Sequence, residues 1–153
     1  MDVIIMPTAD KAAKLAAKII ADAVKAKPAY NLGLATGRTM ERLYAYLADW
    51  HKNEGLDFSL CKSFNLDEYV GFDGSNKDSY RYYMNFHLFD KINIDKRNTY
   101  VPNGVADDLE AAAAEYEATM DSCGGVDMQL LGIGRTGHIG FNEPSDVFTK
   151  GTY

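Results

Sequence analysis

The chain has 153 residues, of which 46% are apolar and 25% charged, a composition that predicts one globular domain with a buried core. Its net charge of −6 argues against general nucleic-acid binding and against attachment to an anionic membrane. No apolar run approaches the length of about 18 residues that a membrane span needs, and no signal peptide is recognisable, so a cytoplasmic protein is expected. The two cysteines, Cys61 and Cys123, lack metal-type spacing and are expected to be reduced core thiols.

Apolar runs and amphipathic stretches alternate in the first third of the chain. Thr8 is a suitable N-cap for a helix with i, i+3, i+4 apolar spacing, and Gly55 is a suitable end for the next helix. The predicted elements are a short strand at 3–6, a helix between Thr8 and Pro28, a buried strand at 30–35, and a helix from Met40 to near Gly55.

The alternation continues to the end of the chain. The predicted elements are a strand at 61–66, a helical stretch within 79–90, a short strand at 99–101, a helix at 107–122 and a strand at 126–133. Strands that alternate with helices form right-handed βαβ units. The expected fold class is therefore α/β, a three-layer Rossmann-like open sheet, mostly parallel, with helices on both faces and a single domain over 1–153.

Three unusual loops follow predicted strands, at 35–39, 67–71 and 134–143. In open α/β sheets, ligands bind in the crevice beyond the carboxyl ends of the strands. We therefore expect these loops to be neighbours in space and to form a site.

The loop with Thr36, Gly37, Arg38 and Thr39 lies between a strand and a helix N-terminus. Free backbone N–H groups, two hydroxyls and the helix dipole favour a phosphate or carboxylate there. A tight turn with a threonine N-cap explains the same residues equally well. The loop is not a Walker A motif, which requires G-x-x-x-x-G-K-[ST].

Asp67 directly follows an apolar strand. At the edge of a crevice, burial would raise the pKa of this carboxyl group toward a value useful for a base. The alternative is that Asp67 only caps a loop. Tyr69 and the aromatic residues of 80–89 are interpreted as core packing.

The stretch "GIGRTGHIGFNEP" (132–144) contains a G-x-G-x-x-G, but no long helix can follow it because Gly140 and Pro144 interrupt the pattern. A dinucleotide-binding turn is therefore disfavoured. Histidine is the side chain suited to proton transfer near neutral pH, so His138 is a candidate acid–base group, and Glu143 in the same loop can orient it. Zinc on His138, Glu143 and Asp67 is disfavoured, since no paired His or Cys supports it, and no G-x-S-x-G provides a serine nucleophile.

The motifs "LGLATGRT", "FNLDEYVG" and "GIGRTGHIGFNEP" resemble, in order and spacing, those of the glucosamine-6-phosphate deaminase (isomerase) family. The resemblance implies deamination of glucosamine 6-phosphate to fructose 6-phosphate and ammonia without metal, nucleotide or other cofactor. It implies that Asp67 is the proton acceptor at C2, that His138 and Glu143 assist ring opening, and that residues 36–39, with Gly137, hold the substrate. It also implies that 1–153 corresponds to the N-terminal part of a longer fold, and that homo-oligomers are compatible with the family.

Two positions depart from the family pattern. Thr136 stands where many relatives carry Asp or Asn, so support for His138 is expected to rest more on Glu143. Arg38 stands where a small residue or proline is common, and it either binds phosphate or points to solvent. The alternatives are a 6-phosphogluconolactonase-like lactone hydrolase of the same fold and a catalytically silent sugar-phosphate-binding module.

Overall fold

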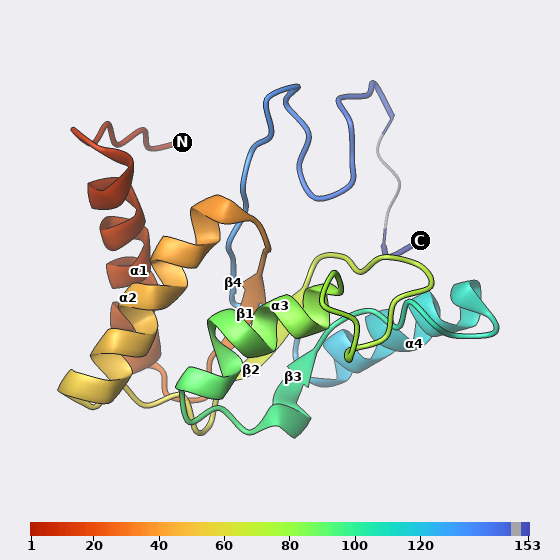
Figure 1. Cartoon of the computed structure of the whole chain (residues 1–153), viewed down its shortest axis with the longest axis horizontal. Helices are drawn as coiled ribbons and strands as arrows, with labels where there is room; N and C mark the ends of the chain where they lie inside the picture. The colour runs from red at the N-terminus through yellow and green to blue at the C-terminus, as the bar shows by residue number, and fades with distance from the viewer. Residues whose placement is uncertain (148–150) are drawn as a thin grey trace.

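The computed structural model describes residues 1–147 and 151–153 of the chain. Strands and helices alternate along it, as the sequence predicted (Figure 1). The longer elements are α1 (Ala9–Ala26), β1 (Asn31–Leu34), α2 (Arg38–Glu54), β2 (Lys62–Asn65), α3 (Tyr80–His87), β3 (Thr99–Tyr100), α4 (Leu109–Ser122) and β4 (Met128–Gln129), with short 3-10 turns at Phe89–Lys91 and Lys96–Asn98.

The four strands form one parallel sheet in the order β3-β2-β1-β4. Residues Asn31 to Leu34 of β1 pair in register with Lys62 to Asn65 of β2, so the central pair is four residues long. The parallel α/β sheet confirms the predicted fold class. Because the strands are parallel, the loop that follows each of them lies at the carboxyl edge of the sheet, where a ligand is expected.

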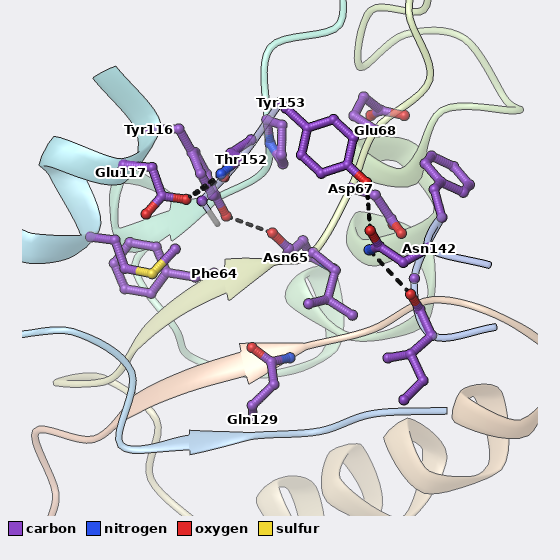
Figure 2. A pocket seen from close by; sticks show the side chains of 17 residues that line it. Phe64, Asn65, Asp67, Glu68, Tyr116, Glu117, Gln129, Asn142, Thr152 and Tyr153 are labelled. Carbon is purple, nitrogen blue, oxygen red and sulfur yellow. Dashed lines mark hydrogen bonds between the residues drawn. The ribbon is translucent and has the colours of Figure 1, made fainter. Parts of the chain in front are cut away.

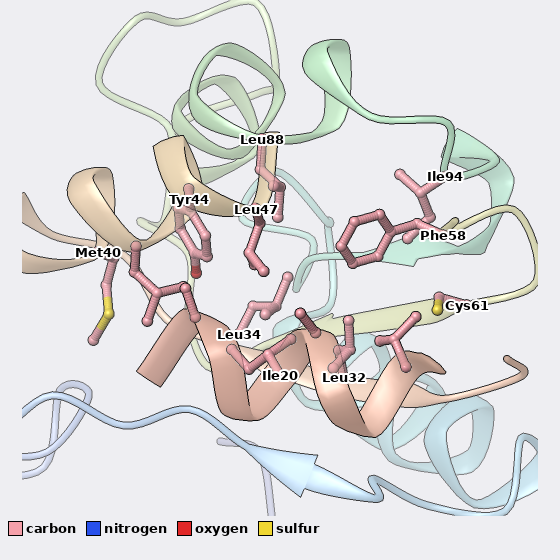
Figure 3. Packing of buried hydrophobic residues seen from close by; sticks show 14 of the residues in the cluster. Ile20, Leu32, Leu34, Met40, Tyr44, Leu47, Phe58, Cys61, Leu88 and Ile94 are labelled. Atoms are coloured by element: carbon pink, nitrogen blue, oxygen red, sulfur yellow. The ribbon is translucent and has the colours of Figure 1, made fainter. Parts of the chain in front are cut away.

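The main core lies between β1 and the helices α1, α2 and α3. Leu32 and Leu34 of β1 point to this side, where Ile20 of α1 and Leu47 of α2 cover them (Figure 3). Side chains alternate along a strand, so Phe64, which is paired with Gly33, points to the opposite face. There the ring of Phe64 stacks on Tyr100 and meets the edge of Tyr116 from α4. Helices therefore cover both faces, as predicted.

The helix boundaries follow local capping. The Thr8 hydroxyl accepts a hydrogen bond from the Lys11 N–H at 3.2 Å, which confirms the predicted N-cap of α1. Gly55 adopts φ +71 and ends α2, also as predicted. The N-cap of α2 is Gly37, which has no side chain, so the predicted threonine N-cap at this turn is wrong.

Two strand predictions need correction. Val3, Ile4 and Ile5 are exposed and belong to no strand, and no described segment pairs with them. An apolar run becomes a strand only where a neighbour accepts its hydrogen bonds. The strand predicted over 126–133 is shorter, at Met128–Gln129, because the four residues of β1 bond only to the backbone of residues 127–130. Within the described residues, no helix is long and apolar enough to span a bilayer.

Candidate active site

The three loops expected to meet do so around a cavity of about 580 Å³, named here the loop cavity. We call the contributing segments the Thr36 loop (residues 36–39), the Asp67 loop (67–72) and the His138 loop (134–143). The loop cavity is lined by Ala35, Thr36, Gly37, Arg38, Thr39, Met40, Glu41, Leu66, Asp67, Tyr69, Tyr80, Tyr83, Gly132, Ile133, Gly134, His138, Gly140 and Phe141. The predicted convergence at the carboxyl edge of the sheet is confirmed.

The Thr36 loop joins the end of β1 to the first turn of α2. Gly37 adopts φ +115, a conformation that residues with a Cβ rarely take, and its carbonyl accepts the Tyr83 hydroxyl at 2.8 Å. No side chain caps α2, so N–H groups of its first turn stay available beside the exposed side chains of Arg38 and Thr39. This is an arrangement suited to an anionic group.

Asp67 lies two residues beyond the end of β2 and is half-buried at the wall of the loop cavity. Burial, and secondarily the negative charge of Glu68, raises the pKa of Asp67 to about 6. A carboxyl group with this pKa is ionised at neutral pH and is a stronger base than an ordinary aspartate. The structure therefore supports the proton-acceptor interpretation over a loop cap.

His138 contacts both a hydroxyl and a carboxylate, and the hydroxyl is the nearer of the two. The Thr136 Oγ1 lies 2.9 Å from His138 Nδ1 and donates to Glu143 Oε2 at 3.0 Å, whereas His138 Nδ1 and Glu143 Oε1 are 3.7 Å apart. A hydroxyl has one hydrogen, so Thr136 accepts from Nδ1–H, and the neutral ring has a free Nε2. The expectation that support for His138 rests more on Glu143 stays a prediction, since Glu143 contacts the imidazole both at ion-pair distance and through the Thr136 hydroxyl.

Gly134 makes room for the imidazole. A Cβ at this position would lie 2.0–2.3 Å from three ring atoms of His138, so the imidazole would have to move. Gly140 adopts φ +59, and a Cβ there would approach the Asp67 carboxylate to 3.3 Å. Gly137, predicted to bind substrate, does not line the loop cavity, and neither do Thr136 and Glu143.

Aromatic side chains close one side of the loop cavity. Tyr69, Tyr80 and Phe141 form a cluster with ring centroids 4.9–5.8 Å apart, and Tyr83 lies nearby on α3. The interpretation of Tyr69 and the 80–89 aromatics as core packing is correct for Phe89 and for Tyr83, which packs against the core and also lines the cavity, but wrong for Tyr69 and Tyr80. Tyr80 was missed because helical periodicity does not distinguish a core-facing ring from one that faces a cavity.

A second cavity of about 360 Å³ lies on the α4 side of Asp67 (Figure 2). Asp67 borders both cavities, and in Figure 2 it lies beside Asn142. On the lining of this second cavity, Glu117 accepts hydrogen bonds from the N–H and the hydroxyl of Thr152. Among the described residues, no three His, Cys, Asp or Glu side chains converge as a metal site would require.

Comparison with known proteins identifies the family. The profile described as glucosamine-6-phosphate isomerases/6-phosphogluconolactonase matches residues 7–140. The glucosamine-6-phosphate deaminase of Clostridium perfringens (strain SM101) is 48% identical over 152 residues, covering 99% of this chain and 63% of that protein. The deaminase of Lachnoclostridium phytofermentans is 51% identical over 138 residues, covering 90% and 58%. The chain thus spans somewhat less than two thirds of these relatives' length.

Solved structures agree with the sequence relatives. A monomeric glucosamine-6-phosphate deaminase is 47% identical, with a TM-score of 0.91 over 94% of this chain and 60% of that one. A 6-phosphogluconolactonase from Thermotoga maritima, 20% identical with a TM-score of 0.70 over 90% and 61%, shares the fold. Because the profile covers most of the chain and sequence identity approaches one half, this chain belongs to the glucosamine-6-phosphate isomerase/6-phosphogluconolactonase family.

Proposed function

We propose that this chain carries the catalytic loops for converting glucosamine 6-phosphate and water into fructose 6-phosphate and ammonia. The observation that supports this most is the placement of Asp67. Its carboxyl group has a pKa raised to about 6 and borders the same cavity as the Thr36 loop and His138. The relatives that are about half identical are named as deaminases of this substrate.

Asp67 is the proton acceptor in this proposal. An aldose-to-ketose shift requires one base that removes the proton from C2 and returns it to C1. Water then adds at C2 and ammonia leaves, so that the atoms balance. A carboxyl group with a pKa near 6 accepts a proton more readily than an ordinary aspartate and still releases it within the cycle.

His138 opens the sugar ring, with Thr136 and Glu143 as its support. Ring opening requires a group that both accepts and donates a proton near neutrality, which is the property of imidazole. The hydrogen bonds from Nδ1 through Thr136 to Glu143 leave Nε2 to exchange protons with the substrate.

The Thr36 loop binds the phosphate of the sugar. Uncapped N–H groups at the start of α2 and the hydroxyls of Thr36 and Thr39 provide donors, and Arg38 adds a positive charge at the same rim. Gly137 contributes through the shape of the His138 loop. The proposed ligand is therefore a small amino-sugar phosphate, with no nucleic-acid or membrane partner.

Ammonia release from glucosamine 6-phosphate tests the proposal. We expect turnover that falls about 10²–10⁴-fold in Asp67→Asn, because that is the usual contribution of a positioned base. Circular dichroism checks that the variant folds. Near-normal turnover by Asp67→Asn would remove Asp67 from the mechanism.

Two other outcomes identify the alternatives. Hydrolysis of 6-phosphogluconolactone without ammonia release from the amino sugar would assign a lactonase. Binding of glucosamine 6-phosphate by calorimetry, without turnover of either compound, would assign a silent binding module.

A further inference from the structure

The carboxylate of Glu68 turns away from the loop cavity, although it is adjacent to Asp67 in sequence. It accepts four hydrogen bonds. The donors are the N–H of Tyr69 at 2.9 Å, the Ser79 hydroxyl at 2.9 Å, the N–H of Tyr80 at 2.8 Å and the N–H of Arg81 at 3.0 Å. Three of these donors belong to the start of α3, so one side chain joins the Asp67 loop to this helix.

The first turn of α3 depends on this carboxylate. Ser79 is the N-cap, and its hydroxyl accepts the N–H of Tyr82 at 3.2 Å. The remaining N–H groups of the turn, from Tyr80 and Arg81, are taken by Glu68. A negative charge at the positive end of a helix dipole is also favourable.

Helix α3 in turn carries side chains into the loop cavity. The Tyr83 hydroxyl donates to the carbonyl of Gly37 in the Thr36 loop at 2.8 Å. The Tyr80 hydroxyl donates to the Tyr69 hydroxyl at 3.2 Å. The contacts of Glu68 therefore connect the Asp67 loop, through α3, to the proposed phosphate-binding loop.

We propose that Glu68 is a positioning residue for Asp67, which fixes α3 against the Asp67 loop and keeps a negative charge beside the Asp67 carboxyl group. The inference rests on the proposed function, in which Asp67 is the proton acceptor. It assigns separate tasks to the adjacent carboxylates, since Asp67 faces the cavity and Glu68 faces the helix.

Several charged and titratable groups surround Asp67, and they determine how much the charge of Glu68 affects its pKa. Burial is the main cause of the raised pKa of Asp67, and the charge of Glu68 is the second. Tyr80 from α3 and Tyr116 from α4 also face Asp67, and the pKa values of both phenols are raised, so they are neutral near pH 6. His138 lines the same cavity. The Arg81 guanidinium senses the charge of Glu68 and donates to Thr99, which places it on the helix side.

Three variants separate positioning from simple helix capping. Glu68→Gln removes the charge and two of the four acceptor contacts, Glu68→Asp keeps the charge on a shorter side chain, and Ser79→Ala weakens the cap without changing any charge. The midpoint of the Asp67 carboxyl titration, followed by ¹³C NMR, is the primary measurement. The pH dependence of ammonia release is the second.

We expect the Asp67 midpoint to fall by roughly 0.5 to 1 pH unit in Glu68→Gln, because a like charge is lost. Glu68→Asp and Ser79→Ala should keep it within about 0.2 unit of the parent, although Ser79→Ala should unfold at a lower temperature, since an N-cap contributes about 1 kcal/mol. An unchanged midpoint in Glu68→Gln, or an equal fall in Ser79→Ala, would overturn the inference. A chain that shows the fall but releases no ammonia would overturn the proposed function alone.

Discussion

The Asp67 loop and the His138 loop both follow a parallel strand, but they are held in different ways. The Asp67 loop is anchored from outside itself, by the three hydrogen bonds that Glu68 accepts from Ser79, Tyr80 and Arg81 and by the bond from the Gly71 N–H to the Gly104 carbonyl at 2.7 Å. The backbone hydrogen bonds of the His138 loop close mostly within the loop, from Gly134 to His138 and from Ile139 to Asn142.

The two loops also differ in how far their polar side chains are exposed to solvent. The Asp67 carboxyl group is half-buried, and its raised pKa depends on a fixed, partly dry environment. The side chains of His138 and Glu143 are 43% and 69% exposed, and their geometry rests on one hydroxyl and one space left by a glycine. Asp67 is therefore positioned by the fold, whereas His138 is positioned by local contacts that single substitutions can remove.

The largest expected effect comes from Gly134→Ala. The new methyl group would overlap the imidazole, so His138 must leave its position and ammonia release should fall about 10²–10⁴-fold, the usual contribution of a positioned acid–base group. Gly132→Ala is the matched control, because its methyl would approach only the flexible end of Met40, at 3.2 Å. Equal losses of ammonia release in the two variants would show that any added methyl group disturbs the loop. The space at Gly134 would then not be what positions His138.

The pH dependence of kcat/KM should report the ionisation of Asp67. Asp67 acts as a base only when ionised, and its pKa is about 6, so the rate should fall about tenfold per pH unit below that value. The residual activity of Asp67→Asn should lack this acid limb. A limb that persists in Asp67→Asn belongs to another group.

Thr136→Val should have a smaller effect. Valine keeps the shape of threonine but breaks the hydrogen bonds to His138 and Glu143, and the loss of about 1.4 kcal/mol corresponds to about tenfold in kcat. Thr136→Ser keeps the hydroxyl and should retain most of the rate. If valine and serine behave alike, the hydroxyl does not support the imidazole.

The smallest expected effect is on stability. The pKa of Asp67 is higher in the folded chain than its ordinary value of 3.8, so the carboxyl group favours folding most below pH 3.8, and this contribution is lost as pH rises through 6. Asp67→Asn should therefore be more stable at pH 7, by about 1 kcal/mol after solvent screening, or about 2–4 °C in Tm. The gain should vanish near pH 4. A variant less stable than the parent at pH 7 would mean that Asp67 makes favourable contacts that outweigh its burial.

Much of the framework could be predicted from the sequence because its signals are local. Thr8 and Gly55 mark helix ends through contacts within one turn, and the buried run 30–35 is continuous in sequence. The edge strands could not be predicted well, since Val3–Met6 has the composition of a strand but pairs with no segment that the structure describes.

The sequence predicts the candidate site where a side chain lies near the end of its own strand. It does not predict contacts between side chains that are distant in the chain. Asp67 and His138 were found from their positions after apolar strands. The link from Glu68 to Tyr80 and Arg81 spans 12 and 13 residues and depends on how α3 folds back over the Asp67 loop. The signal that could have suggested this link is an acidic residue that precedes a predicted helix start, where the first backbone N–H groups need acceptors.

The exposed apolar segment at Val3–Met6 also has a consequence for how the chain behaves at high concentration. Three consecutive β-prone side chains, Val3, Ile4 and Ile5, are in contact with solvent and carry no charge of their own. Such a segment favours intermolecular pairing, which the net charge of −6 opposes through mutual repulsion between molecules. Added salt screens that repulsion, so colloidal stability should depend on ionic strength more strongly than folding does.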